Sequence, residues 1–445
     1  MATDREVLVR RASAAVFVVF VLSGFNFASW ASRLPAIRDG LGYSPDKMGI
    51  LLLVGSVGSL LALPLAGIAA ERLGTRRAVL LFAVVNAVGL TIASVGVAVD
   101  QVVVVGLGLA VFGVGTGIWD AAMNLEGASV EQRLGRTVMP RYHAGFSFGT
   151  VAAAGIAALA AGLHVPVVVH IPIAVGLSLV AVAFAVRHFL AETSGPHAAH
   201  VAPSARDGEI DATAAPAVAD APRGARGALA AWLEPRTLLI GLVVLAAALT
   251  EGAANDWVSL AVVDGFDVDH AVGALTFGLF VTAMTTMRWF GTSLLDRFGR
   301  VAVLRLCAGL ALVGLLTFGL SSVLPVALVG VLAWGAGAAL GFPVGMSAAS
   351  DDPLRAAARV SVVSTIGYSA FLAGPPLLGL LAQHVGYRHA LLAITIPVLL
   401  GLLVVNAAAP PRDATAGAVP GDADRRAVGE DPASAVADDR AGRAV

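Results

Sequence analysis

The 445-residue sequence contains little cysteine, lysine or charge, and each shortage excludes a class of protein. The single cysteine, Cys307, cannot form a disulfide bond within the chain. The single lysine, Lys47, follows Asp46, so the sequence lacks the Gly-Lys-Ser/Thr loop that ATP-driven pumps require. Charged residues make up 13% of the chain and form no strongly basic face, so no nucleic-acid partner is expected. Without a metal cluster, cofactor motif or nucleophile constellation, we expect no enzyme, no cofactor and no metal site.

Long apolar runs are what the sequence has in abundance. Hydrophobic residues make up 58% of the chain and the mean hydropathy is +0.84, far outside the range of a soluble globular domain. Each run is near the roughly 20 residues that a helix needs to cross a bilayer. The runs cover approximately 12–32, 47–70, 78–98, 102–123, 142–162, 166–187, 237–262, 271–292, 302–321, 323–346, 360–382 and 388–408. The sequence therefore predicts an all-α polytopic membrane protein with twelve transmembrane helices.

Positive charge lies almost entirely in alternate gaps between these runs. The other gaps hold only Arg33, Arg38, Lys47 and Arg388. Because loop arginines and lysines stay on the cytoplasmic side, both termini and the central loop are expected in the cytoplasm, with the protein in the plasma (bacterial inner) membrane. The first run, preceded by Arg10 and Arg11, resembles a signal peptide. It is long, lacks a clear cleavage site and is followed by eleven more runs, so we predict a retained helix.

Composition divides the chain into five parts. A long stretch near the middle and the C-terminal stretch replace Leu, Val and Phe by Ala, Pro, Gly, Asp and Arg, and such segments cannot bury a core. We expect a cytoplasmic N-terminus over 1–11, a six-helix bundle over 12–191, a disordered cytoplasmic linker over 192–231, a second six-helix bundle over 232–409 and a disordered cytoplasmic tail over 410–445.

A short motif recurs at equivalent places in the two halves. Aligning Glu71 on Asp296 also places Arg72 on Arg297 and Gly74 on Gly299. Glycine suits a tight reversal, the acid can pair across the halves, and arginine anchors a loop at the headgroups. Such copies imply two bundles about a pseudo-two-fold axis with a substrate site between them. We expect conformational gating by Gly67, Glu71, Arg72, Gly74, Arg76, Asp296, Arg297, Gly299 and Arg300.

On this motif the chain resembles the major facilitator superfamily of secondary transporters, over about residues 10–410. The resemblance implies two six-helix bundles that alternate access to a central site. The plain alternative is an ordinary short loop with positive charges, but two copies at equivalent places argue against it.

Ionisable residues inside the apolar runs are functional candidates, because each costs roughly 2.5–3.5 kcal/mol at a helix centre. Asp120 and Asn124 lie four residues apart on one helix face, and Glu251 and Asn255 repeat that spacing. Asp256 points elsewhere on its helix. Arg288 lies too deep to reach the headgroups comfortably, so it should have an acidic partner, in a salt bridge or in a ligand site.

Polar and aromatic residues complete the candidate binding set. Asn26, Trp30 and Arg33 form one stripe that can line a cavity, and Trp119 and Trp257 can stack on a solute or serve as packing. His143 can titrate near neutral pH or be a packing histidine. The predicted substrate-binding residues are Asn26, Trp30, Trp119, His143, Glu251, Asn255, Asp256, Trp257 and Arg288.

Within the superfamily, the Asp120-x-x-x-Asn124 unit is similar to the Glu-x-x-x-Asn motif of the fucose-permease branch of proton-coupled sugar symporters. The similarity extends to His143, Phe146 and Gly149, to Gly341-Phe342-Pro343 and to Glu251, and also covers bacterial inner-membrane members of unassigned substrate. The resemblance gives Asp120, with Asn124, the role of exchanging the proton.

These observations predict a secondary active transporter, functional as a monomer in the lipid bilayer, that imports a small polar solute together with protons. A sugar is one candidate solute. Proton-antiport efflux of drugs or metabolites is the alternative, because the same fold and acid serve either direction. A non-transporting membrane sensor is a remote alternative, since it would not need carboxylates deep in both halves.

Overall fold

The computed structural model describes residues 2–136, 138–190, 230–352 and 355–410. Nearly all of the predicted linker and tail lies outside the described residues. In chain order the helices are α1 (Ala2–Ala31), α2 (Leu34–Gly40), α3 (Pro45–Leu73), α4 (Thr75–Ala98), α5 (Val102–Leu134), α6 (Met139–Gly162), α7 (Val167–Ala185), η1 (Val186–His188), α9 (Pro235–Phe266), α10 (His270–Phe298), α11 (Arg300–Leu320), α12 (Leu324–Ala338), α13 (Gly341–Ala349), α14 (Ala356–Val385), α15 (Tyr387–Ala390), η3 (Leu391–Ile394), α16 (Thr395–Val404) and η4 (Val405–Ala408). No strand occurs among the residues that the structure describes.

The predicted fold class is confirmed. In the described part of the chain, twelve helical segments are long and apolar enough to cross a bilayer. The largest differences from the predicted boundaries are in α1 and α5. Helix α1 already begins at Ala2, so residues 2–11 are helical, and α5 continues to Leu134 instead of ending near residue 123. The gap after the first span contains a short helix, α2, which the apolar pattern did not predict because it is only seven residues long.

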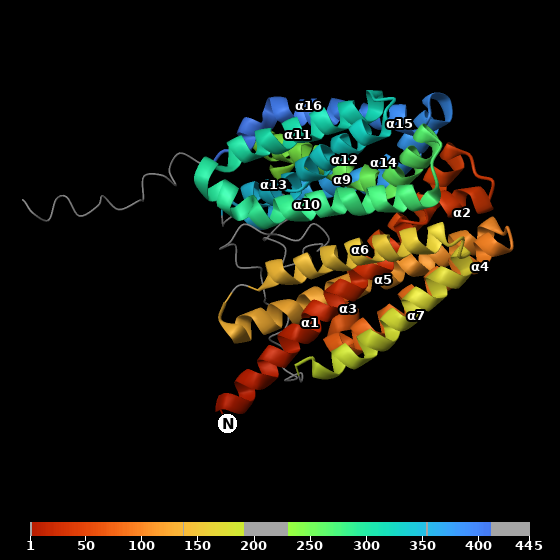
Figure 1. Ribbon diagram of the computed structural model, residues 1–445. Helices are drawn as coiled ribbons and strands as arrows, with labels where there is room; N and C mark the ends of the chain where they lie inside the picture. The colour runs from red at the N-terminus through yellow and green to blue at the C-terminus, as the bar shows by residue number, and fades with distance from the viewer. Residues whose placement is uncertain (1, 137, 191–229, 353–354, 411–445) are drawn as a thin grey trace, which may run out of the picture. The chain divides into compact units, whose positions relative to one another are not determined.

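Helices α1 to α7, here called the N-half, pack mainly on one another, and α9 to η4, here called the C-half, do the same (Figure 1). In the N-half the closest partners are α4 with α5, α3 with α5 and α1 with α6, and in the C-half they are α11 with α12 and α9 with α14. Helices α1 and α6 approach so closely that a side chain on Gly149 would overlap the carbonyl of Val21. The halves meet through α3 with α14 and through α6 with α10.

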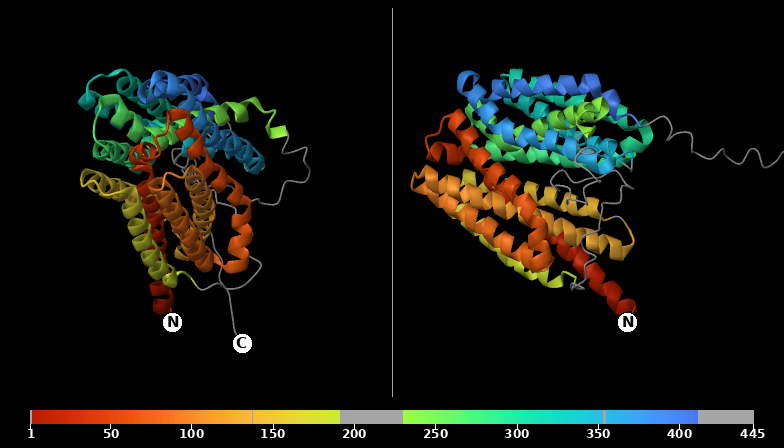
Figure 2. Two further views of the ribbon diagram at one scale, coloured as in Figure 1. Left: turned by 90° about the vertical axis from the view of Figure 1, so that its right-hand side faces the viewer. Right: turned by 180° about the vertical axis from the view of Figure 1, so that it is seen from behind.

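The helix ends fall on two sides, which Figure 2 shows from two directions. The side that carries α2 also holds the helix ends near residues 98–102, 162–167, 266–270, 320–324 and 385–387, and is called the α2 side. The opposite side, called the Gly74 side, holds those near residues 73–75, 134–139, 298–300 and 349–356. The largest cluster of buried apolar side chains joins the C-half to N-half residues such as Trp30, Ile37 and Met48, which lie toward the α2 side. The Gly74 end of the N-half has a separate core around Phe20 and Trp119.

Candidate functional site

An ion pair joins the two halves on the α2 side. The Nη1 atom of Arg38, in α2, lies 2.5 Å from Oδ2 of Asp264, near the end of α9. Beside it, Nε2 of His270 in α10 lies 2.8 Å from Oδ2 of Asp39. The Arg38 guanidinium also lies over the ring of Tyr387, 5.7 Å from its centroid. These contacts hold the α2-side ends of the two halves together.

The charge of Arg38 is stabilised by its acidic neighbours. Its side chain is only 12% exposed. Burial by itself lowers the pKa of the guanidinium, but hydrogen bonds to Asp264 and Asp39 outweigh that effect and raise the pKa above its ordinary value. The contact with Asp264 therefore persists as an ion pair at any pH at which the aspartate is ionised.

On the Gly74 side the acid and the arginine that precede each motif glycine are exposed. Glu71 and Asp296, near the ends of α3 and α10, have no hydrogen-bond or ion-pair partner in the described part of the chain. The Arg297 guanidinium lies over the neighbouring ring of Phe298, 5.3 Å from its centroid. The chain is thus in a conformation with its halves joined by charge on the α2 side, while Glu71 and Asp296 on the other side pair with none of the described residues.

The two motif glycines have the geometry that the repeat predicted. Gly74 and Gly299 each stand alone between two helices, with φ of 78° and 76°. Positive φ is readily adopted only by glycine, so this residue permits the helix to end and the next to begin at once. Gly67 lies about two helical turns before Gly74, in an open position. Arg72 and Arg76 are exposed beside Gly74.

The residue after each motif glycine contacts an equivalent acid. Thr75 Oγ1 donates to Glu126 Oε2 at 2.5 Å, and Arg300 Nη1 donates to Asp351 at 2.9 and 3.0 Å. Both pairs join residues 51 apart in the chain, so they are copies of one contact in the two halves. Asp351 also accepts a bond from Arg236 at 2.7 Å. Arg300, predicted to gate, therefore ties the start of α11 to the segment after α13.

Glu251 and Arg288 form an ion pair within two of the membrane-spanning segments. Their side chains meet at 2.8 Å between α9 and α10 and are 17% and 29% exposed. Arg288 Nε also donates to the carbonyl of Ala339, between α12 and α13. Pro343 lacks the N–H that would otherwise bond that carbonyl four residues earlier, so the tenth span breaks here and Arg288 satisfies the freed acceptor. The structure thus supplies the acidic partner expected for Arg288.

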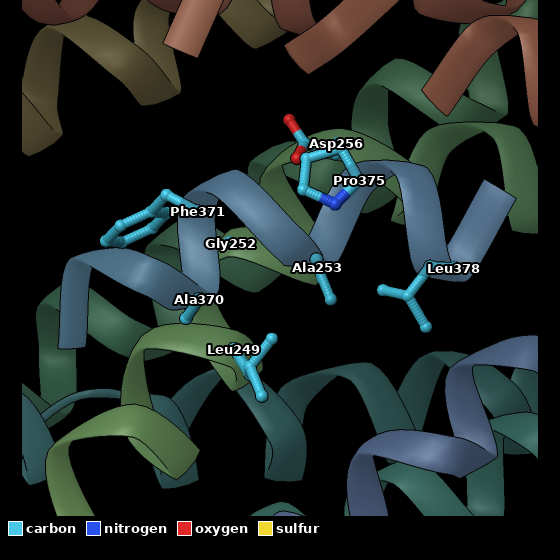
Figure 3. A pocket seen from close by; sticks show the side chains of 9 residues that line it. Leu249, Gly252, Ala253, Asp256, Ala370, Phe371, Pro375 and Leu378 are labelled. Atoms are coloured by element: carbon cyan, nitrogen blue, oxygen red, sulfur yellow. The ribbon is translucent and has the colours of Figure 1, made fainter. Parts of the chain in front are cut away.

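Asp256 lies at a small cavity between α9 and α14 (Figure 3). The cavity has room for about one water molecule and is otherwise lined by apolar residues and glycines, among them Phe371 and Pro375. Asn255, the neighbouring candidate, is partly exposed on α9. Glu251 and Asp256 therefore have different surroundings, as their different helix faces predicted.

In the N-half, Asp120 and Asn124 are both 8% exposed. Asn124 Nδ2 donates to the backbone carbonyl of Asp120 at 3.0 Å instead of to its carboxylate. The helical register that the sequence predicted is present, but it positions the two side chains as neighbours and not as a hydrogen-bonded pair.

The predicted polar stripe of the first span is packed, and does not line a cavity. Asn26 donates to Asn86 at 2.9 Å, and Asn86 donates to Thr116 at 3.0 Å, which links α1, α4 and α5. Trp30 is 4% exposed within the core that joins the halves. Helix periodicity identifies a face but not what that face packs against, so a substrate-binding role for Asn26 and Trp30 stays a prediction.

The remaining aromatic candidates are also packed in this conformation. Trp119 and Trp257 are each 1% exposed, and Trp257 contacts Tyr387 with ring centroids 5.5 Å apart. His143 is partly exposed, and its ring meets Phe20 edge-on at 4.9 Å. Neither tryptophan ring has the open face that a stacked solute needs.

Arg33 is a buried charge with few partners. It is 4% exposed, donates to the carbonyl of Val165 at 2.7 Å, and has no partner for Nε or Nη1 among the described residues. Both ring nitrogens of His170 nearby are likewise buried without partners. Burial lowers the pKa of Arg33, and no described carboxylate opposes that effect.

Sequence reasoning missed the α2-side contact. Arg38 is an exception to the charge pattern, and Asp39, Asp264 and His270 fall in gaps between the predicted apolar runs. The sequence does contain one indication of this contact. An arginine on the side that is otherwise poor in positive charge indicates a local acidic partner.

Comparison with known families shows to which family the chain belongs. A sequence model described as the Major Facilitator Superfamily matches residues 16–370, and an overlapping match covers residues 294–437. The chain belongs to the major facilitator superfamily. The resemblance that the repeated motif indicated is thereby confirmed, and the protein is an integral membrane transporter of this superfamily.

Several superfamily relatives are similar along nearly the whole chain. An uncharacterized transporter, y4wD, of Sinorhizobium fredii is 30% identical over 395 residues, covering 85% of this chain and 96% of the relative. The membrane protein MosC of Rhizobium meliloti is 26% identical, with 88% of each chain covered. Among solved structures, the nucleoside transporter NupG gives a TM-score of 0.68 at 15% identity, covering 90% of this chain and 98% of that one. The E. coli fucose:proton symporter FucP gives 0.58 at 14%, covering 90% and 98%. These last two likenesses concern the fold.

Proposed function

We propose that this superfamily transporter is a secondary active, proton-coupled symporter of a small polar solute, with a sugar as the first candidate. The observation that carries the proposal is the asymmetry between the two sides. Arg38 and Asp264 pair across the halves on the α2 side, whereas on the Gly74 side the motif acids Glu71 and Asp296 have no partner within the described ranges. Two sides that pair in alternate conformations would give access to a central site from one side at a time.

The α2 side is proposed to be extracellular. The charge pattern supports this orientation, because arginines are concentrated in the loops of the Gly74 side. Both termini are then cytoplasmic, in the plasma membrane of a bacterial cell. In that orientation the described conformation is closed to the outside.

Asp120 is proposed to exchange the coupling proton. It is a buried acid in the fourth span of the N-half, and water reaching it from the Gly74 side would favour its ionised form. Asn124 on the next turn can hydrogen-bond either protonation form of the carboxyl after a rotamer change. Glu251, Asn255, Asp256 and Arg288 are the C-half candidates for contacting solute or proton.

The test begins with ligand identification. Purified protein is melted in the presence of sugars, sugar acids, nucleosides and hydrophobic cations, since a ligand of the native state raises the melting temperature. The best polar ligand is then supplied to proteoliposomes with an imposed pH gradient. The proposal expects uphill accumulation driven by inward protons. Stabilisation confined to hydrophobic cations, or export driven by the same gradient, would contradict symport and favour efflux.

Two variants test whether Asp120 exchanges the coupling proton. Asp120→Asn is expected to abolish pH-driven accumulation but to retain ligand stabilisation and solute exchange, which need no net proton movement. Asp100→Asn is the matched control, because Asp100 is an exposed acid in an α2-side turn. Normal accumulation by Asp120→Asn would refute the assignment.

A further inference from the structure

Asp256 is an intramembrane acid without a hydrogen-bond or ion-pair partner among the described residues. It lies ten residues before Phe266, the last residue of α9, so its backbone is about 15 Å from the α2 side. Glu251, on the same helix, is compensated by Arg288 at 2.8 Å. Of these two C-half acids, Asp256 is the one without a compensating charge.

The cavity beside Asp256 suits a water molecule and not an organic solute. Its volume is near that of a single water, and its other lining residues are Leu249, Gly252, Ala253, Ala370, Phe371, Gly374, Pro375 and Leu378. Figure 3 shows the carboxyl group next to Pro375 of α14. Because Pro375 and Pro376 lack N–H groups, the carbonyls four residues before them have no helical donor, so this stretch of α14 offers acceptors to a protonated carboxyl.

The α14 wall of the cavity is in contact with the N-half through Pro375. Gly49 of α3 lies against the carbonyl of Pro375 so tightly that a Cβ there would overlap it. One turn further along α14, a Cβ on Gly379 would touch the carbonyl of Pro45 and the ring of Trp257. Separation of α3 from α14 would therefore expose the Asp256 cavity to water on the α2 side.

An ionised carboxylate in an apolar cavity without a partner is costly, whereas a protonated one is tolerated. We propose that Asp256 is a proton-binding site that takes up a proton from the α2 side as the two halves close there. The proposal rests on the proton coupling proposed above and adds a second acid, in the opposite half, to Asp120. Protonation would then be a condition for closing the α2 side.

The charged groups around the site identify the control needed. The cavity face of α14 carries no ionisable side chain. The first turn of α3 carries Asp46 and Lys47, and the neighbouring acids on α9 are Glu251 and Asp264, each paired with an arginine. His270 with Asp39 is a further titratable contact at the closing surface. The experiment therefore uses a His270→Gln background.

The experiment measures closure directly and needs no substrate. Spin labels are placed by Leu163→Cys and Val323→Cys, at exposed α2-side turns of the two halves, with Cys307→Ala removing the native thiol. Distances between the two labels are recorded in lipid nanodiscs from about pH 5 to about pH 8, a range that brackets neutral pH. The parent should open as pH rises, by up to about tenfold in the open-to-closed ratio per pH unit, the limit for one proton.

Asp256→Asn, a neutral isostere, should be closed throughout the range, with less than about a twofold change per pH unit. Asp256→Glu should keep a pH response with a shifted midpoint. This variant tests the proposal if Asp256→Asn does not fold. Asp267→Asn, at an exposed α2-side turn, is the matched control and should behave as the parent. Infrared difference spectra should show a protonated carboxyl band at low pH that Asp256→Asn lacks.

A pH response that survives in Asp256→Asn, or is missing from the parent, would overturn the proposal. Because closure is measured without solute, its outcome is separate from that of the transport assay. If Asp256→Asn loses the pH response but the wild type shows no proton-driven accumulation, Asp256 is a proton site and symport is wrong. If the wild type accumulates solute but Asp256→Asn keeps its pH response, symport holds and Asp256 is not the site.

Discussion

Arg38 and Asp264 form an ion pair of 2.5 Å between residues 226 apart in the chain. Arg38 also bonds Asp39, and these two aspartates occupy equivalent positions in the halves, because the same offset of 225 residues relates Asp39 to Asp264 (264 − 39) and Gly74 to Gly299 (299 − 74). One arginine from the N-half is therefore held between a repeat-equivalent pair of acids. A contact at such a place can open only if the two halves move apart.

Breaking this contact should open the α2 side. Asp264→Asn removes the charge partner of Arg38 across the halves, and the Asp264 side chain is 41% exposed, so solvent screening limits the effect to about 1 kcal/mol, or roughly fivefold in the ratio of conformers. Distances between labels at Leu163 and Val323 measure the shift. Arg10→Gln is the control, since the exposed pair of Arg10 with Glu6 lies within α1. Unchanged distances in Asp264→Asn would mean that apolar packing alone closes this side.

Removing the motif acids should have the opposite effect. Glu71 and Asp296 are unpaired in the conformation described, so Glu71→Ala and Asp296→Ala cannot weaken it through a lost contact. They should instead destabilise the conformation that closes the Gly74 side, and the population joined on the α2 side should rise. The same labels report the change, which should be a shortening of the mean distance. If neither variant alters the distribution, the motif loops serve topology alone.

The sequence was sufficient for the twelve spans, the repeat and the family, because each rests on a pattern repeated many times. Partners are harder to predict. The 3.6-residue period correctly placed Glu251 and Asp256 on different faces, yet it could not show that Arg288 lies opposite Glu251 or that Asn26 lies opposite Asn86. Such pairs are set by how helices distant in sequence cross, and that depends on close approaches such as Gly149 against Val21.

The pair of Glu251 with Arg288 should stabilise the C-half. Glu251→Gln leaves a guanidinium within the membrane-spanning region without its charge partner, so the melting temperature should fall. The loss in unfolding free energy should be on the order of 1–3 kcal/mol, because both side chains are partly exposed. Combining it with Arg288→Met should recover part of that loss, because the unpaired charge is gone. A double variant that melts at the sum of the two single losses would show that the residues do not interact in the protein.

Glu234 should make stability depend on pH. Hydrogen bonding from Arg359, at 2.6 Å, holds the pKa of Glu234 below its ordinary value, and Thr237 contributes a further bond. A depressed folded-state pKa stabilises the protein above the unfolded value of about 4.3, and this contribution is lost as pH falls through the folded pKa. Melting curves of wild type and Glu234→Gln should therefore differ at pH values above about 5 and converge in acid. A difference that grows on acidification would contradict the assignment.

Arg33 should be a residue whose removal stabilises the protein. Arg33 is 4% exposed, Nε and Nη1 have no partner in the described structure, and Nη2 donates a hydrogen bond to the carbonyl of Val165. Arg33→Met keeps most of the side-chain volume and removes a buried charge, at the cost of that one hydrogen bond. The melting temperature should rise, by an amount corresponding to about 1–3 kcal/mol. Arg33→Lys keeps the charge and should not show the gain. Destabilisation by Arg33→Met would mean that the guanidinium is compensated in the membrane by a bound group, and exchange of chloride for a bulky anion during melting would then identify whether that group is a small anion.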